Sequence, residues 1–423
     1  MSKLEKYPSY KDSGVEWLGE IPKGWELTKL GTKFIERKEK VSDKDYEPLS
    51  VTKNGVIPQL DSAAKSNDGD NRKLVKKGDF VINSRSDRKG SSGVSSIDGS
   101  VSLIYIVLEP IGINPVFCNY LLKSNGFIEE FYRNGHGIVA DLWTTRFWDM
   151  KSIMLGIPPK QEQIKIASFL DEKTEQLDKA IQQKEQLIKL LKERRQILIN
   201  DAVTKGLDKT VAMKDSGVEW IGDIPEGWEV KKLKFISNIF RGKFTHRPRN
   251  DISLYDGVYP FFQTGDIARA GKYLASYRQT LNEKGLKVST LFPKGTIVVT
   301  IAANIGDVSI LDIDACFPDS IVGFNPLDYV LNEFLYYTLA VMKDVFMSST
   351  IKNTQMNLNI DRIGNNLISM PPKREQEKIV NYIEKNNQKI DKAINLQQQQ
   401  IIKLKEYKTT LIDSVVTGKV RVS

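Results

Sequence analysis

Residues 11–26 read KDSGVEWLGEIPKGWE, and residues 214–229 read KDSGVEWIGDIPEGWE. The two segments agree at 13 of 16 positions when they are aligned at an offset of 203 residues. A match of this length does not arise by chance, so the chain contains an internal duplication, and this repeat decides its architecture. We call the repeated segment the Trp box.

A second pair of matching segments lies downstream of the two Trp boxes. Residues 157–163 read IPPKQEQ and residues 370–376 read MPPKREQ, at an offset of 213 that holds nearly to the chain end. Each half is therefore predicted to consist of a Trp box, a variable domain and a helix. The expected parts are 1–156 (opening segment and first variable domain), 157–208 (first long helix), 209–369 (second Trp box and variable domain) and 370–423 (second long helix).

Between the repeated segments, residues 27–156 and 230–369 share little beyond short echoes, such as KGDFVI at 77–82 and KGTIVV at 294–299. These echoes predict one common fold for both variable domains. We expect strands at 80–83, 102–107, 296–301 and 308–311, because short alternating β-branched runs end at Gly or Asn. Helical patterns at 116–132 and 331–347 make each domain α+β, with a mostly antiparallel sheet.

The helical segments carry apolar residues at a spacing of 3.5, which is typical of a coiled coil. The pattern runs through Leu170, Leu177, Ile181 and Ile188 in the first copy, and through Ile383, Ile390, Ile394 and Ile401 in the second. Polar residues interrupt it at matching places: Thr174 and Asn387, Lys184 and Gln397, Arg195 and Lys408. We expect two helices of about 65–70 Å that pair antiparallel and separate the domains with pseudo-twofold symmetry. Association of each helix into a homo-oligomer is the alternative.

The composition is that of a folded, basic protein. The formal charge of +9 permits a polyanionic partner, because Lys and Arg release counterions from phosphate backbones. Two cysteines, Cys118 and Cys316, are best interpreted as reduced and buried, which suits a cytoplasmic location. Residues 1–12 lack an apolar core, and the best apolar run, residues 101–108, is too short to span a bilayer, so no membrane role is expected.

Motifs for catalysis are missing from the sequence. It contains no phosphate-binding or dinucleotide-binding glycine loop and no polar-Pro-Pro-aromatic box for adenine methylation. The two histidines lie far apart without cysteines at ligand spacing, so a metal site is not expected. The acidic residues near 171–173 fall within the predicted coiled coil and are interpreted as a solvated face. We predict no active site in this chain.

Two loops are candidates for contacts to nucleic acid. The first, NSRSDRKGSSG at 83–93, directly follows a predicted strand, and the second, RGKFTHRPR at 241–249, holds four cations and a histidine. Arg and Lys donors can bind phosphates or guanine edges, and glycines allow close approach of the backbone. Solvated surface charge is the alternative. The candidate DNA-binding residues are Ser84, Arg85, Arg88, Lys89, Arg241, Lys243, His246, Arg247 and Arg249.

Together, the Trp box DSGVEWxGxIPxGWE, the PPxxEQ opening of each helix, the Gly-turn strand and the doubled layout resemble the specificity subunits of type I restriction-modification systems. The likeness covers essentially the whole chain. It implies target-recognition domains that each read half of a split double-stranded DNA sequence, and a complex with two methyltransferase and two restriction subunits. The partners would use S-adenosylmethionine for adenine-N6 methylation and ATP with Mg for restriction, and this chain would bind no cofactor itself.

Three other functions are weighed against this one. A DNA or RNA adaptor of another system would form no stable complex with a methyltransferase. A coiled-coil structural protein would not bind DNA sequence-specifically, and an enzyme would need the catalytic residues that the sequence lacks. Divergence of the two variable domains by drift after an old duplication is also possible without two different targets.

Overall fold

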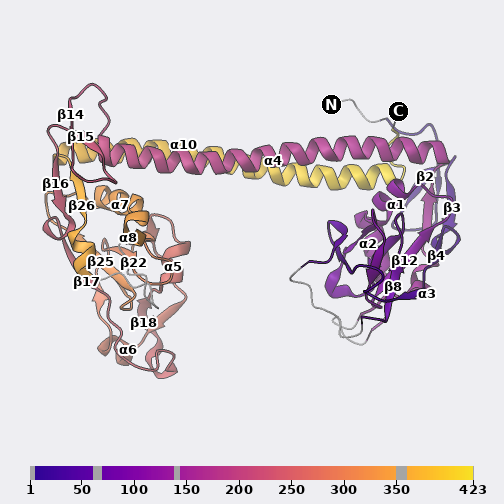
Figure 1. The fold of residues 1–423 in the computed structure, drawn as a ribbon, viewed down its shortest axis with the longest axis horizontal. Helices are drawn as coiled ribbons and strands as arrows, with labels where there is room; N and C mark the ends of the chain where they lie inside the picture. The colour runs from indigo at the N-terminus through magenta and orange to yellow at the C-terminus, as the bar shows by residue number, and fades with distance from the viewer. Residues whose placement is uncertain (1–4, 61–68, 138–142, 349–359, 423) are drawn as a thin grey trace. The chain divides into compact units, whose positions relative to one another are not determined.

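The computed structural model describes residues 5–60, 69–137, 143–348 and 360–422. The chain forms two compact units, one made of residues 1–185 and 398–423 and the other of residues 186–397 (Figure 1). Each unit therefore contains one variable domain and parts of both long helices. Residues 1–4 of the polar N-terminal segment 1–12, on which a prediction was made, lie outside the described residues.

The first unit is rich in short strands, as predicted for an α+β domain. Its strands are β1 (Tyr10–Asp12), β2 (Glu20–Pro22), β3 (Glu26–Lys29), β4 (Phe34–Glu36), β5 (Lys40–Val41), β6 (Leu49–Thr52), β7 (Gly55–Pro58), β8 (Arg72–Val75), β9 (Phe80–Asn83), β10 (Ser92–Val94), β11 (Gly99–Val101), β12 (Tyr105–Pro110) and β13 (Met154–Ile157). Its short helices are α1 (Pro115–Leu122), α2 (Asn125–Arg133) and α3 (Phe147–Met150).

The second unit repeats this composition. Its strands are β14 (Met213–Asp215), β15 (Asp223–Pro225), β16 (Glu229–Lys232), β17 (Ser237–Arg241), β18 (Tyr255–Phe261), β19 (Tyr273–Leu274), β20 (Gln279–Leu281), β21 (Leu291–Phe292), β22 (Ile297–Thr300), β23 (Val308–Leu311), β24 (Ala315–Cys316), β25 (Ile321–Pro326) and β26 (Leu367–Met370). Its short helices are α5 (Thr264–Arg269), α6 (Glu283–Lys287), α7 (Asn332–Val341), α8 (Lys343–Ser348) and α9 (Ile360–Asn365).

The central sheets of the two units have the same topology. The first has the order β10-β9-β12-β4, and the second has the order β23-β22-β25-β17 with β19 added beside β23. The shared strand pairs are antiparallel in both units, while β19 joins β23 in parallel. Strands β9 and β22 are buried along their whole length, because layers of side chains cover both faces of the sheet. The prediction of one mostly antiparallel fold for both domains is confirmed.

Three of the predicted elements need correction. The strand expected at 102–107 begins only at Tyr105, because Tyr105 N donates to Ser102 O at 3.1 Å and closes a turn there. The single helical stretch expected at 116–132 is two helices, since Ser124 caps α2 by accepting from Phe127 N. The stretch expected at 331–347 is likewise divided into α7 and α8.

The two long helices are α4 (Lys160–Lys205) and α10 (Lys373–Val416), and parts of both lie in contact within each unit. The predicted heptad positions are buried or half-buried throughout, for example at Leu170, Ile181, Ile390 and Ile401, while most positions between them are exposed. This burial confirms the heptad pattern.

The polar interruptions of the heptads form contacts between the helices. In the first unit Lys408 Nζ lies 2.6 Å from Asp178 Oδ1, and in the second Arg195 pairs with Asp391. These are the same pair in the two copies, because each residue maps onto its counterpart at the offset of 213. In the first unit Lys405 also lies 3.9 Å from Glu185. From the pair Asp178–Lys408 to this pair, residue numbers rise along α4 and fall along α10, so the helices run antiparallel.

The PPxxEQ segment forms the joint between each long helix and its own variable domain. Glu162 Oε1 accepts from Trp25 Nε1 of the first Trp box at 3.2 Å, and Glu375 Oε2 accepts from Trp228 Nε1 at 3.0 Å. Both tryptophans are almost fully buried. The buried indoles thus have charge-assisted hydrogen-bond partners, which explains why the Trp box and the helix opening are repeated together.

The glutamine of the same segment bonds to the backbone just before α1 in the first unit and just before α7 in the second. Gln163 Oε1 accepts from Asn114 N at 2.7 Å, and Gln376 Oε1 accepts from Leu331 N at 2.8 Å. Their Nε2 groups donate to Pro158 O and Pro371 O. These amides are only 3% and 1% exposed, so their loss would leave several buried polar groups unpaired.

A tyrosine adds a third link between each domain and its long helix. Tyr120 OH donates to Asp171 Oδ1 at 2.8 Å, and Tyr337 OH donates to Glu384 Oε1 at 2.8 Å. Figure 1 shows α7, which carries Tyr337, beside α10. Burial raises the pKa of Tyr120 to about 12 and also raises that of Tyr337, so both phenols remain donors at neutral pH. Each domain is therefore held on its helix by the same three side-chain types.

Both cysteines are free and buried, as predicted, and burial raises the pKa of each thiol. Among the described residues, no helix is both long and apolar enough to cross a membrane.

Candidate nucleic-acid interface

The first candidate loop begins where β9 ends. Arg85 N donates to Asn83 Oδ1 at 2.9 Å, and the hydroxyl of Tyr132 on α2 donates to the carbonyls of Asn83 and Arg85 at 3.3 and 3.2 Å. Burial raises the pKa of Tyr132 to about 12, which keeps this donor protonated at neutral pH. The start of the loop is therefore anchored by backbone contacts and does not depend on its cations.

The polar side chains of this loop differ in how far they are available. Ser84 is only 7% exposed, whereas Arg85 and Arg88 are exposed, and Arg88 Nε lies 3.6 Å from Asp87. Lys89 Nζ lies 2.6 Å from Glu129 Oε2. Arg85 and Arg88 are thus the cations of this loop that are best placed to meet an anion. The DNA contact of all four predicted residues stays a prediction.

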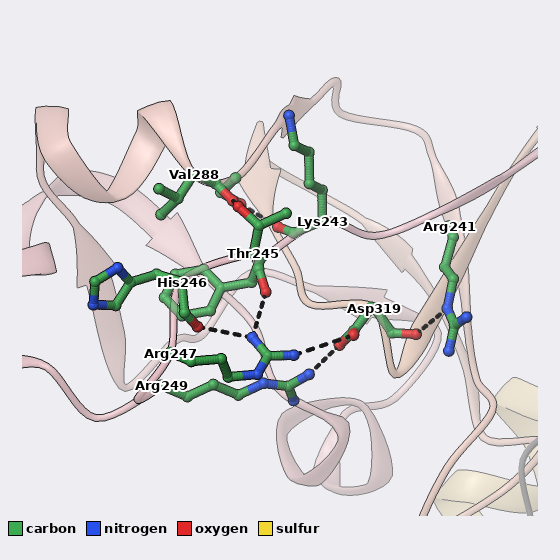
Figure 2. Close-up of polar contacts among 10 residues, drawn as sticks. Arg241, Lys243, Thr245, His246, Arg247, Arg249, Val288 and Asp319 are labelled. Atoms are coloured by element: carbon green, nitrogen blue, oxygen red, sulfur yellow. Dashed lines mark hydrogen bonds and ion pairs between the residues drawn. The ribbon is translucent and has the colours of Figure 1, made fainter.

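The second candidate loop is organised by an aspartate that the sequence analysis did not single out. Arg241 Nε donates to the backbone oxygen of Asp319 at 2.5 Å, Arg247 Nη2 lies 3.6 Å from its carboxylate, and Arg249 Nη2 donates to the same carboxylate (Figure 2). Asp319 lies 70 residues beyond Arg249, just before β25, so no local motif announces the contact.

Lys243 and His246, the other two predicted residues of the loop, point away from Asp319 (Figure 2). The backbone of Lys243 is held by Phe317 O and by the Ser289 hydroxyl, and its side chain is exposed. His246 Nε2 lies 3.0 Å from Asp251 Oδ2. Three of the five predicted residues therefore form one cluster, and two do not belong to it.

The cluster carries an excess of positive charge. Three guanidinium groups contact Asp319, two at its carboxylate and one at its backbone oxygen, and the side chains of Arg247 and Arg249 are 55% and 44% exposed. Asp319 orients the planar donor groups of both side chains, and the remaining N–H groups can face an incoming anion. A phosphate group matches this arrangement in charge and in hydrogen-bonding geometry.

The two units build their basic loops at different strand ends. In the first unit the loop follows β9, but the equivalent turn after β22 is closed by Thr300, whose Oγ1 accepts from Asp307 N at 3.0 Å. In the second unit the loop follows β17, whereas Arg37 after the equivalent β4 makes two hydrogen bonds to Asp79, at 2.7 and 3.1 Å. The side chain of Arg37 is mostly buried and belongs to the core. The domains thus share a fold and differ in their exposed cations.

Clusters suited to a metal are not found in the described part of the chain, where no three His, Cys, Asp or Glu side chains come together.

Comparisons with known proteins agree with this architecture. Residues 225–406 match the family model described as the type I restriction modification DNA specificity domain. The MjaIX specificity subunit of Methanocaldococcus jannaschii is 32% identical over 38% of each chain. A putative type I restriction enzyme specificity subunit of that organism, MjaX, is 23% identical over 96% of both chains.

Over its whole length the chain is similar to the specificity subunits of type I restriction-modification enzymes. A solved structure concerning complex assembly of the type I R-M system covers 94% of this chain and 98% of its own, with a TM-score of 0.72 at 17% identity. That likeness shows the fold. The family model covers the second domain and most of α10, while the full-length relative and the internal repeat extend the relationship to the first half. Members of this family are the non-catalytic, DNA-recognising subunits of their enzymes.

Proposed function

We propose that this specificity subunit reads a bipartite DNA target, with one half-site bound by each recognition domain. It positions two adenine methyltransferase subunits and two translocase-nuclease subunits on that DNA, in the cytoplasm. S-adenosylmethionine belongs to the methyltransferase partners, and ATP with Mg belongs to the restriction partners, whereas the chain itself binds none of them.

The observation that carries this proposal is the contrast between matched joints and unlike loops. The Trp–Glu, Gln–backbone and Tyr–carboxylate contacts recur in both units, whereas the exposed cations follow β9 in one unit and β17 in the other. A repeated joint serves the same mechanical task twice. Different loops on the same sheet present different donors, which is what two different half-sites require.

An exchange of domains tests the assignment of one half-site to each domain. Residues 27–156 would be replaced by the corresponding domain of another specificity subunit, and the full chain would be expressed with its methyltransferase partner. Mapping of N6-methyladenine should show one half of the target changed and the other half kept. The bipartite assignment is wrong if the exchange rewrites both halves, and the partner assignment is wrong if no methyltransferase subunit co-purifies.

The long helices are proposed to set the unread gap between the half-sites. Insertion of one heptad into α4 after Glu185 and one into α10 after Gln397 would keep the apolar seam continuous. Seven helical residues add about 10 Å, or about three base pairs of duplex. The mapped gap should lengthen with both half-sites unchanged. A complex that still methylates the original spacing would contradict this role of the helices.

A further inference from the structure

A hollow of about 510 Å³ lies beside the arginine cluster in the second recognition domain. The second basic loop, β18, the start of α5 and the segment before β25 surround it. Among its lining residues are Arg249, Asn250, Ile252, Gln263, Gln279 and Ser320. A cationic donor suited to phosphate and neutral amides thus line the same hollow. In DNA complexes, phosphate contacts position the protein, and contacts to base edges, which amides can make, read the sequence.

Two of these amides form a pair whose position is set by the sheet. Gln279 on β20 pairs with Phe261 at the end of β18, and Gln263 follows two residues later. Gln263 N donates to Asp266 Oδ2 at 2.9 Å, which holds the residue at the start of α5. Gln263 Nε2 donates to Gln279 Oε1 at 2.5 Å, and both side chains are exposed. Each amide therefore restricts the rotamer of the other.

The shared bond leaves a pattern that matches one base. After it forms, one amide still offers its carbonyl oxygen and the other still offers N–H, whichever way the two groups are oriented. An acceptor beside a donor is complementary to adenine, which presents N6–H₂ and N7 in the major groove. Guanine presents two acceptors there, so it would leave the amide carbonyl facing a carbonyl.

An apolar side chain stands at the edge of the same hollow. Ile252 is 86% exposed, on a turn that Asp251 caps by accepting from Ser253 N at 3.0 Å. Single exposed apolar residues are common on surfaces, but this one lines the same hollow as the amide pair. The C5-methyl group of thymine is the apolar feature of an A·T pair in the major groove.

We infer that Gln263 and Gln279 recognise the adenine of an A·T base pair in the half-site of the second domain, with Ile252 against the thymine methyl group. Arg247 and Arg249 hold the neighbouring phosphates. This inference rests on the proposed function, because it requires that the second domain binds its half-site in duplex DNA.

The first test changes the hydrogen-bonding pattern without changing side-chain size. Gln279→Glu replaces a donor by an acceptor, a pattern that favours the N4–H₂ group of cytosine. The full chain with its methyltransferase partner should show relaxed or altered preference at one A·T position of the second half-site, with the first half-site unchanged. Gln182→Glu, at an exposed position on α4, is the control with the same charge change and should leave both half-sites unchanged.

The second test measures binding of the same complex to duplexes with single replacements at that position. The wild type should bind about 5- to 150-fold more weakly when the A·T pair becomes G·C, and Gln279→Glu should lose most of this discrimination. Uracil in place of thymine removes only the methyl group, so it should weaken the wild type but not Ile252→Ala. The Ile252 arm remains informative if the Gln279 variant does not fold.

The outcomes separate this inference from the proposed function. A wild-type complex that recognises no bipartite sequence overturns both. A wild-type complex with a normal bipartite target overturns the inference alone if replacing each A·T pair of the second half-site leaves binding unchanged, or if folded Gln279→Glu and Ile252→Ala variants discriminate bases as the wild type does.

Discussion

Removing the two exposed arginines of the Asp319 cluster should reduce the salt dependence of DNA binding. The perturbation is the double variant Arg247→Gln/Arg249→Gln, which keeps side-chain polarity and removes two charges. Both groups are about half exposed and already oriented by Asp319, so each is placed to neutralise one phosphate. Loss of two such contacts should lower the slope of log K against log salt by about 1.8.

This slope corresponds to a measurable difference in affinity. Between 50 and 200 mM salt, wild-type binding should weaken about 12-fold more than binding by the double variant. Fluorescence anisotropy with a labelled duplex containing the mapped target, titrated at four salt concentrations, measures the slope directly. Circular dichroism would establish that the variant is folded.

A matched control removes two charges elsewhere in the same unit. Lys231 and Lys294 lie 2.8 Å from Glu229 and Asp312, so they are also exposed or half-exposed cations in ion pairs. Lys231→Gln/Lys294→Gln should change the slope much less. If the arginine variant keeps the wild-type slope, or if both double variants lower it equally, the cluster is not a specific phosphate site.

Three further predictions concern other parts of the molecule. Neutralising the three cations of the first loop, Arg85, Arg88 and Lys89, should weaken DNA binding without lowering the melting temperature. Unchanged affinity of the folded variant would contradict this prediction. Gly418→Ala should lower the free energy of unfolding more than Gly112→Ala, as measured by calorimetry. Both glycines have a positive φ, which costs an alanine about 1–2 kcal/mol, but only at Gly418 would the new Cβ lie 2.4 Å from Pro22 Cδ, which adds about 1–3 kcal/mol. Equal losses of stability in the two variants would refute the clash. Asp413→Asn should raise the melting temperature at pH 7 but not below pH 3.8. Burial raises the pKa of Asp413 in the folded state, so the buried carboxylate that is present at pH 7 destabilises the fold, whereas below pH 3.8 the side chain is protonated in both the folded and the unfolded state. An equal effect of the substitution at both pH values would contradict this prediction.

Much of the architecture could be predicted because it depends on short-range patterns. The heptad spacing of α4 and α10 follows from helical geometry, and β9 and β23 have the predicted bounds because their apolar runs end at turn residues. The break between α1 and α2 was missed, because the capping role of Ser124 depends on a change of direction that an apolar helical pattern does not reveal.

The sequence by itself determined that the chain is duplicated, that two long helices accompany two α+β domains, and where the candidate basic loops lie. These conclusions need only identity, periodicity and composition, which are local properties of the chain. Only the tertiary structure showed that Glu162 and Glu375 bind the tryptophans of the Trp boxes, and that Asp319 gathers three arginines. These contacts join residues 70 or more positions apart, and the packing of sheets and helices brings their partners together. Gln263 and Gln279 lie only 16 residues apart, but their pairing also depends on the fold, because it follows from the register of β18 and β20.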